Sequence, residues 1–520
     1  MTSAPPPARS VPPLATEDAM GNRDAFSQES LVRLRFVLAW GALCVLSACM
    51  VGPDYVKPKA ATTAAYKEQP GWKQAQPQDQ FPRGKWWEIF NDPQLNALED
   101  QVYISNQNVA FALAQFQQAR AIVQEARSAL FPTVTASASV TRQKPSSTLG
   151  PAPVAHGAYN YYTLPIEASW VVDLWGQARR AYQATEANAQ ASAADLETAR
   201  LTATSEVAQD YFQLRTLDAQ KALLDDTVVA YQKSFDLTKN RYASGVASKA
   251  DVAAAETQLR STQAQAIDLG VQRAQMENAI AILIGKPPAT FSLPASPLTA
   301  TPPPIPVGVP SALLERRPDI ASAERRVAAA NAEIGVAIAA YYPTLTLNAI
   351  GGFSTANLAE WFTYPSRAWS VGASLAGTLF NGGLFQAQTD AARAAYDGTV
   401  ATYRQTVLTG FQEVEDNLAA LRILGEEAKV QDEAVKAAKL SVELSTNQYK
   451  VGTISTLDLL TVMTVARNNE RTLVTIQGNR LGASVLLIKA LGGGWKSADL
   501  PEVAVKLPAP LTHRQAPTSD

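Results

Sequence analysis

The sequence has few of the residues that build metal sites and disulfide frameworks. Its 520 residues include two cysteines and two histidines. A structural zinc site takes about four such ligands and a catalytic site about three, so we expect neither a buried metal site nor a disulfide framework. The 45 basic and 47 acidic residues give a net charge of −2, which provides no positive field to attract nucleic acid. Hydrophobic residues make up 47%, enough for folded structure.

Signatures of catalysis are also missing. The chain has no Gly-rich phosphate loop, no His-Glu-x-x-His and no Gly-x-Ser-x-Gly. His156 falls in a Pro/Gly-rich loop and His513 in the C-terminal tail, and neither has a nearby partner that suggests a triad. We therefore expect no enzyme and no cofactor, with carboxylate-only chemistry as an alternative that the sequence leaves open.

The first 48 residues are typical of an export signal. Arg33 and Arg35 precede an apolar stretch of 11 residues over 36–46. The sequence LSAC over 46–49 resembles the lipobox of bacterial lipoproteins, in which the signal is removed and the cysteine is acylated. We predict a signal peptide over 1–48, with Met20 as an alternative start, and a lipidated segment over 49–93 attached through Cys49. An N-terminal membrane anchor is the alternative, but its 17 residues fall short of the roughly 20 that span a bilayer.

One pattern occurs twice in the chain. Tyr, Gly, Ser and Asp recur at a spacing of 207 residues, as Tyr242, Gly245, Ser248 and Asp251 and again as Tyr449, Gly452, Ser455 and Asp458. Other matches follow in the same order, which predicts a tandem duplication. We assign repeat 1 to 94–285, an extended, non-helical Pro-rich linker to 286–310, repeat 2 to 311–492 and a tail to 493–520.

Two segments in each repeat alternate between apolar and polar residues. They lie near 133–141 and 162–174 in repeat 1, and near 344–352 and 369–379 in repeat 2. Strands of about 9–13 residues with an apolar face and a small polar face suit a water-filled barrel in lipid. A half-buried sheet in a soluble protein is the alternative. Four strands per chain cannot close a barrel, so in lipid other copies must supply the rest, and three chains would give twelve strands.

The remaining segments predict unusually long helices. We expect them over 94–130, 176–240, 249–284, 318–341, 382–448 and 456–491. The stretch 176–240 has 65 residues without proline and would extend about 100 Å. Its many alanines favour the helix and allow close lateral packing in a wall of helices. A long coiled-coil scaffold is the alternative, although it does not account for the strands.

The repeated motif lies where each long helix pair turns. Gly245 and Gly452 suit a tight turn with positive φ, and Ser248 and Ser455 suit the N-cap of the next helix. The aspartate three residues after each serine, at positions 251 and 458, fits a capping arrangement. A pore-lining role for these aspartates is an equal alternative.

Further motifs follow one another from residue 46 to about 495. They are LSACMVGPDY over 46–55, WWEIFNDPQLN over 86–96, LERRPDI over 314–320, FNGG over 380–383, GFQEVED over 410–416 and the YxxG of 449–452. In this order they resemble the outer membrane factor (TolC-like) family, in its lipoprotein branch near the NodT and OprM-type efflux proteins.

The resemblance implies an α+β membrane protein. Its homotrimer would form a 12-stranded transmembrane β-barrel that continues into a long periplasmic α-helical barrel. It would sit in the Gram-negative outer membrane, in contact with its lipid and lipid-anchored, and extend into the periplasm. Implied partners are a periplasmic adaptor (membrane fusion protein) and an inner-membrane transporter of the resistance-nodulation-division (RND) type. The implied function is the passive exit duct of a tripartite efflux pump for small molecules, with a duct for type I protein secretion as the alternative.

The resemblance also implies roles for the turn residues. Asp458 matches a position where relatives form acidic rings at the closed tip, whereas the next inward position here is Thr461. Tyr449 and Asn447 are candidates for holding the closed tip by hydrogen bonds. Adaptor docking is implied at the turns, through Tyr242, Gly245, Ser248, Asp251, Gly452 and Ser455.

Overall fold

The computed structural model describes residues 50–60, 62–63, 65–68, 84–144, 146, 157–305, 307 and 310–500. The predicted signal peptide, Cys49, His156 and His513 lie outside the described residues. The chain divides into two compact units. Unit 1 comprises Met1–Gly52, Leu130–Arg179 and Ile338–Asn381, and unit 2 comprises Pro53–Ala129, Arg180–Ala337 and Gly382–Asp520.

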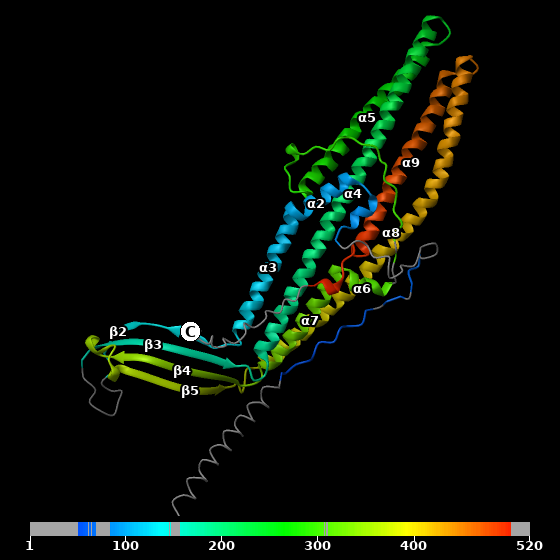
Figure 1. The fold of residues 1–520 in the computed structure, drawn as a ribbon. Helices are drawn as coiled ribbons and strands as arrows, with labels where there is room; N and C mark the ends of the chain where they lie inside the picture. Colours follow the sequence, from blue (N-terminus) through cyan, green and yellow to red (C-terminus); the bar gives the residue numbers. More distant parts are fainter. Residues whose placement is uncertain are drawn as a thin grey trace, which may run out of the picture. The chain divides into compact units, whose positions relative to one another are not determined.

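Unit 1 contains an antiparallel sheet (Figure 1). Its strands are β1 (Thr133–Ala136), β2 (Ser139–Gln143), β3 (Tyr159–Val172), β4 (Thr344–Thr355) and β5 (Arg367–Ala376). The order is β1-β3-β4-β5, and β2 also pairs with β3. β1 and β2 therefore line one edge of the sheet and β5 lines the other.

The strand register places the apolar side chains on one face, as the alternation predicts. Val134, Ala168, Ala349 and Val371 pair in one row across the four strands. Directly paired residues of antiparallel strands share a face. The neighbouring row is polar: Ser169 pairs with Asn348, and its hydroxyl donates to the Asn348 Oδ1 at 2.9 Å. The apolar face is not buried within the chain, because Val371 is 75% exposed and Trp369 81%.

One predicted strand is interrupted. The segment expected near 133–141 forms two strands, β1 and β2, instead of one. The break lies opposite Pro165 of β3, whose carbonyl accepts from the Ser137 N–H at 3.2 Å but which has no N–H to return. On its other side Pro165 pairs with Gly352, where a Cβ would come within 2.1 Å of the Leu164 carbonyl oxygen. The ladder is thus interrupted opposite the proline on one side of β3, and on the other side the close β3 backbone leaves room only for glycine at position 352.

Unit 2 is built from long helices. Their bounds are α2 (Pro93–Ser105), α3 (Gln107–Ser128), α4 (Gln177–Ala243), α5 (Lys249–Leu283), α6 (Leu313–Arg316), α7 (Pro318–Ala339), α8 (Leu384–Lys450) and α9 (Thr456–Ala490). Short 3-10 turns add η1 (Trp86–Phe90), η2 (Pro288–Thr290), η3 (Pro310–Ala312) and η6 (Ser497–Asp499), while η4 (Leu358–Glu360) and η5 (Tyr364–Ser366) belong to unit 1. In the described part of the chain, no helix combines the length and apolar character needed to cross a membrane.

The predicted helix over 94–130 is wrong at one point, because it breaks at Asn106. This residue has extended backbone angles, and its side-chain oxygen accepts from the Val109 N–H at 3.0 Å, which starts α3. Its amide nitrogen donates to the Leu283 carbonyl at 2.7 Å, at the end of α5. A single side chain therefore caps one helix and satisfies the end of another.

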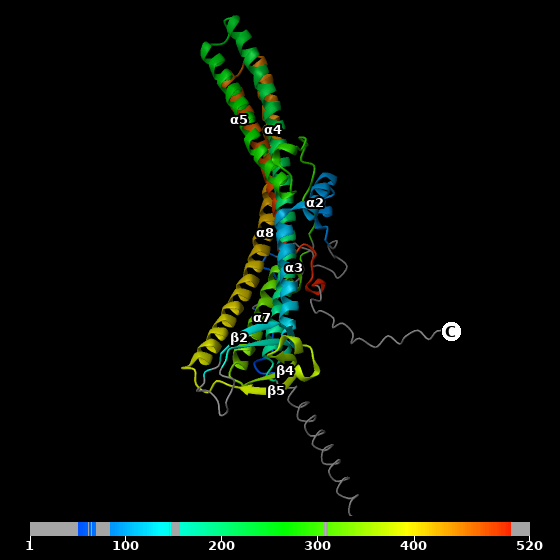
Figure 2. The same ribbon diagram turned by 90° about the vertical axis from the view of Figure 1, so that its left-hand side faces the viewer.

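The two helical hairpins match in length. α4 and α8 each have 67 residues, and α5 and α9 each have 35. The turns of the α4/α5 and α8/α9 hairpins lie at the same end of unit 2 in both views (Figures 1 and 2). Behind them, Tyr231 of α4, Ala255 and Leu259 of α5 and Leu460 of α9 form a small buried cluster.

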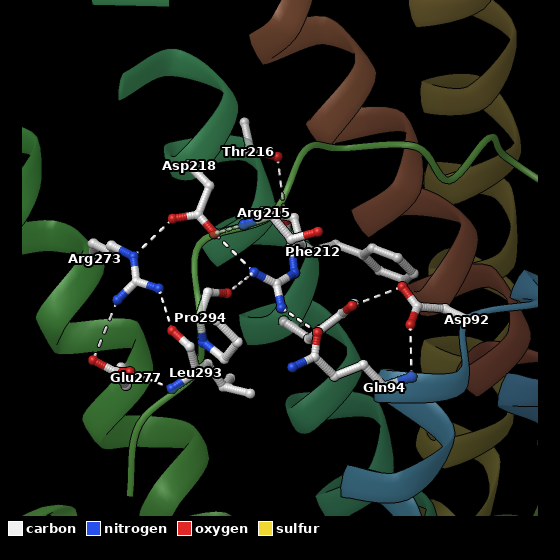
Figure 3. A network of polar contacts seen from close by, with 12 residues as sticks. Asp92, Gln94, Phe212, Arg215, Thr216, Asp218, Arg273, Glu277, Leu293 and Pro294 are labelled. Carbon is white, nitrogen blue, oxygen red and sulfur yellow. Dashed lines mark hydrogen bonds and ion pairs between the residues drawn. The ribbon is translucent and has the colours of Figure 1, made fainter. Parts of the chain in front are cut away.

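A buried ionic network fixes the Pro-rich linker to α4 and α5 (Figure 3). Arg215 donates to the Asp218 carboxylate at 2.8 Å and to the Pro294 carbonyl at 2.9 Å. Arg273 donates to the other Asp218 oxygen at 2.7 Å and to the Leu293 carbonyl at 2.6 Å. The linker is extended over most of its described length, as predicted, but η2 forms a single helical turn near its start.

Candidate functional site at the helix turns

Both hairpins turn through the same backbone geometry. Gly245 and Gly452 have φ of 75° and 84°, in the left-handed region that favours glycine. In each turn the residue after glycine donates its N–H back over the helix end: Val246 to the Arg241 carbonyl at 2.8 Å, and Thr453 to the Gln448 carbonyl at 3.0 Å. The prediction of tight turns at these glycines is confirmed.

Each turn ends in a complete capping box. The Asp251 N–H donates to Ser248 Oγ at 3.1 Å, and the Ser248 N–H donates to the Asp251 carboxylate at 2.8 Å. Ser455 and Asp458 repeat both bonds, at 3.2 and 3.1 Å. Each pair satisfies two backbone N–H groups at the start of a helix. The capping interpretation is confirmed for both aspartates.

The capping bonds also set the charge of the two aspartates. Hydrogen bonds from the side chain and backbone of Ser455 lower the pKa of Asp458 below its ordinary value. Hydrogen bonds from the backbone and side chain of Ser248, helped by the Arg241 charge, lower the pKa of Asp251. Asp458 is exposed and Asp251 is partly exposed, and both are ionised at neutral pH, so each turn carries one fixed negative charge.

Tyr449 joins the two hairpins. Its side chain is 2% exposed, and its hydroxyl lies within hydrogen-bonding distance of Thr238 Oγ1 at 3.2 Å and of Thr456 Oγ1 at 3.1 Å. The Arg241 guanidinium lies over the Tyr449 ring at 4.7 Å and donates to its backbone carbonyl at 3.1 Å. Thr238 and Arg241 belong to α4, so these contacts connect α4 to the end of α8.

The other predicted residues remain near the turns without joining this contact. The Asn447 carbonyl accepts from the Val451 N–H at 3.3 Å, within the last turn of α8. Thr461 is exposed and donates its hydroxyl to the Leu457 carbonyl at 2.8 Å. Tyr242, which corresponds to Tyr449, is 47% exposed. The structure thus brings Tyr449 into a buried contact and leaves Tyr242, Asp458 and Thr461 at the surface of the chain.

Sequence reasoning missed Arg241. It directly precedes the repeated tyrosine, where the second copy has Gln448. That difference between the copies was the available signal. It could not reveal the partner, since Tyr449 lies 208 residues further along the chain.

The turns, the hairpins and the antiparallel sheet can be compared with known proteins. The family model described as outer membrane efflux protein matches residues 98–286 and 309–493. The solvent efflux pump outer membrane protein SrpC of Pseudomonas putida is 32% identical over 466 residues, which cover 87% of this chain and 97% of SrpC. The probable efflux pump outer membrane protein TtgC of Pseudomonas putida is 30% identical over 455 residues, or 87% of this chain and 94% of TtgC. The solved structure of the outer-membrane channel OprN superimposes with a TM-score of 0.80 at 28% identity, over 86% of this chain and 100% of that one.

The chain therefore belongs to the outer membrane efflux protein family. The family resemblance carried by the sequence motifs is confirmed, and so is the prediction of an outer-membrane efflux protein. Its fold is that of the outer-membrane channels.

Proposed function

We propose that three copies of this chain form the exit duct of a tripartite efflux pump. In this assembly the strands of unit 1 close into a twelve-stranded transmembrane barrel, and the hairpins of unit 2 form a helical barrel in the periplasm. Small molecules pass through passively, driven by an inner-membrane transporter. The efflux-pump names of TtgC and SrpC support this role over protein secretion.

One observation carries the proposal: the sheet of unit 1 is incomplete by itself. Its edges at β1/β2 and at β5 pair with no other described strand, and its apolar face is exposed. Unpaired edges expose backbone N–H and C=O groups, which lipid cannot satisfy. Pairing β5 of one copy with β1/β2 of the next satisfies both edges, and it turns the face of Trp369 and Val371 toward lipid.

The turns supply the gate and the adaptor surface in this proposal. Asp458 lies at the surface as an ionised carboxylate, so three symmetry-related copies would repel one another and favour cations. Thr461, one turn further, makes a neutral position, while Tyr449 and Asn447 hold the closed tip. The adaptor contacts the grooves beside Tyr242, Gly245, Ser248, Asp251, Gly452 and Ser455, and the RND-type transporter works through it. Acylated Cys49 anchors each copy in the outer membrane.

Two measurements on the purified protein test the assembly. Native mass spectrometry in detergent should give three chains, and planar bilayers should show cation-selective conductance. A stable, water-soluble monomer without detergent would contradict the proposal. For the anchor, Cys49→Ser should block incorporation of radiolabelled palmitate, and persistent labelling would reject Cys49 as the acylated residue.

The gate assignment has a matched control in the other turn. Asp458→Ala should reduce the cation preference of the conductance, whereas Asp251→Ala should leave it unchanged. Both substitutions remove one capping box and one negative charge, which makes them a matched pair. Equal loss of selectivity in both variants, or in neither, would reject the ring at Asp458.

A further inference from the structure

A cavity of about 440 Å³ lies among α4, α5, α8 and α9, in the body of unit 2. α9 approaches α4 closely at Gly478, where a Cβ would come within 2.2 Å of Thr216 Oγ1. One turn further along α9, Gly482 faces open space, since no atom lies within 4 Å of a Cβ built there. Gly478 thus lets α9 pack closely against α4, and the missing side chain at Gly482 leaves space beside this contact for a small molecule.

The cavity opens on the side of α4 that faces away from the linker. Tyr211 and Arg215 point to the linker side, where Tyr211 donates to Asp92 and Arg215 contacts Pro294. Successive residues of a helix are rotated by about 100°, so residues two positions from Tyr211 point to the opposite side. Gln209 and Gln213 stand at those positions, and both line the cavity.

This side faces the lumen in the proposed duct. The linker and α2 cover the other side of α4, and they would obstruct the passage if they lay inside the helical barrel (Figure 3). The cavity is then a recess in the inner wall, reached by any compound in transit.

The lining carries a single charge. Asp210 is the one charged residue among those around the cavity, and its carboxylate makes no hydrogen bond or ion pair with any described residue. Burial, and then the nearby Glu206 carboxylate, raise the pKa of Asp210 to about 6. The lining residues contributed by α5, α8 and α9 are uncharged. At neutral pH the recess therefore holds a half-buried carboxylate without a cationic partner.

Amide and apolar groups surround this carboxylate. Gln209, Gln213, Asn417 and Asn479 bring amides from three helices, and Met276 and Leu424 add apolar surface. Amides satisfy N–H donors of a ligand, and the apolar side chains suit an aromatic or aliphatic body. Asp210 and Glu206 repel anions.

We propose that this cavity binds a small organic cation with an apolar body, as a station in the inner wall of the duct. The inference rests on the proposed function, because the duct places the recess in the path of exported compounds. Asp210 pairs with the positive charge of the bound compound, and the side-chain amide oxygens accept hydrogen bonds from its N–H groups. Anionic compounds pass without binding there.

Ethidium, an aromatic cation with N–H groups, is a suitable probe. Its binding to the purified trimer in detergent is followed by fluorescence anisotropy at pH 7.5, with fluorescein as the anionic comparison. Asp210→Asn should weaken ethidium binding by about tenfold or more, the range of a charge-assisted contact. The control Asp226→Asn removes an exposed aspartate on the linker side of the same helix and should change nothing. Equal affinity of the wild type and Asp210→Asn, or equal weakening by Asp226→Asn, would overturn the proposal.

A pH series gives a second readout of the same carboxylate. Ethidium affinity should fall as the pH is lowered through about 6, because protonation of Asp210 removes its negative charge. The decline should be absent in Asp210→Asn. An identical decline in both proteins would assign the titration to another group and would count against the site.

A steric variant tests the cavity without changing charge. Gly482→Leu on α9 fills the open space and should abolish ethidium binding. The control Gly398→Leu, at an open glycine of α8 outside the cavity, should leave binding unchanged. Circular dichroism and native mass identify any variant that fails to fold.

Planar-bilayer conductance distinguishes failure of the binding site from failure of the proposed duct. If the wild type conducts and Gly482→Leu binds ethidium as well as the wild type, the binding site is contradicted and the duct is not. Absence of conductance in the wild type would instead contradict the duct.

Discussion

The two hairpin turns share one local structure but differ in what surrounds them. Both have a left-handed glycine, a serine cap and an aspartate that completes the capping box. Yet Tyr449 is buried at 2% exposure, while its counterpart Tyr242 is 47% exposed. The same motif therefore produces an internal contact in one hairpin and a free surface in the other.

The residue before each tyrosine also differs between the two turns. Arg241 reaches across to the Tyr449 ring and carbonyl, whereas Gln448 is exposed. Arg241 of the first hairpin therefore contacts the tyrosine of the second, and no equivalent contact of Gln448 with Tyr242 is present among the described residues. Local bonds thus fix the shape of both turns, and the contacts that Thr238 and Arg241 make with Tyr449 distinguish the second turn from the first.

The largest expected effect separates the two tyrosines. Tyr449→Ala should lower the local free energy of opening at the α8/α9 turn by about 3 kcal/mol, because it removes a buried aromatic ring. Tyr242→Ala should change the α4/α5 turn by less than about 0.5 kcal/mol. Amide hydrogen exchange of the two turns measures both.

The hydroxyl contribution can be isolated from that of the ring. Tyr449→Phe keeps the packing but leaves Thr238 and Thr456 without their shared partner, so a loss of about 1 kcal/mol is expected. If Tyr449→Ala and Tyr242→Ala lower the local free energy of opening equally, the different burial of the two tyrosines does not affect the stability of the turns.

A smaller effect than that of Tyr449→Ala is expected at Arg241, the residue before Tyr242. Arg241→Ala should destabilise the α8/α9 turn by about 1–2 kcal/mol, through loss of the cation–π contact and of the bond to the Tyr449 carbonyl. The matched substitution Gln448→Ala should have no measurable effect. Hydrogen exchange in the α8/α9 turn is the measurement, and greater loss of protection in Gln448→Ala would contradict the one-way contact.

The serine caps should behave alike. Ser248→Ala and Ser455→Ala should each cost about 1 kcal/mol at the start of the following helix, since each removes a side-chain bond to a backbone N–H. Thermal unfolding and local exchange rates measure this loss. A clear difference between the two variants would show that the caps depend on the contact at Tyr449.

Acid titration should give the smallest effect. The pKa of Asp251 and of Asp458 is lowered in the folded chain, so their stabilisation is complete above the ordinary carboxyl pKa of about 4. It is lost only as the pH falls through the lowered values. The protection factors of the amides at both turns, which are exchange rates corrected for the intrinsic effect of pH, should therefore be constant from pH 7 to about 5 in the wild type. A fall in the protection factors of either turn near pH 6 would contradict these assignments.

Most of the fold was predictable because it follows from local preferences. Long proline-free, Ala-rich stretches predicted the helices, and period-two alternation predicted the strand faces. The Gly, Ser and Asp spacing predicted both capping boxes for the same reason, since each bond spans three residues. The break opposite Pro165 was not predicted, although the missing N–H of a proline in a central strand is a signal for one.

The rest depends on partners far apart in the sequence. Asn106 breaks a helix while bonding the end of α5, and Arg241 finds Tyr449 in the other repeat. Asp218 binds two arginines, of which Arg273 belongs to a different helix. A sequence indicates which groups need partners, but spacing alone does not reveal which distant group satisfies them.

The matched helix lengths constrain how this chain can diverge. α4 and α8 have 67 residues each, and their turns lie at the same end of unit 2 (Figure 1). Inserting four residues into α4 alone would raise one turn by about 6 Å and rotate it by about 40°, which would separate Arg241 from Tyr449. Viable insertions in these helices should therefore arrive as coupled pairs about 207 positions apart, and an unpaired one should be tolerated only in the linker or the loops.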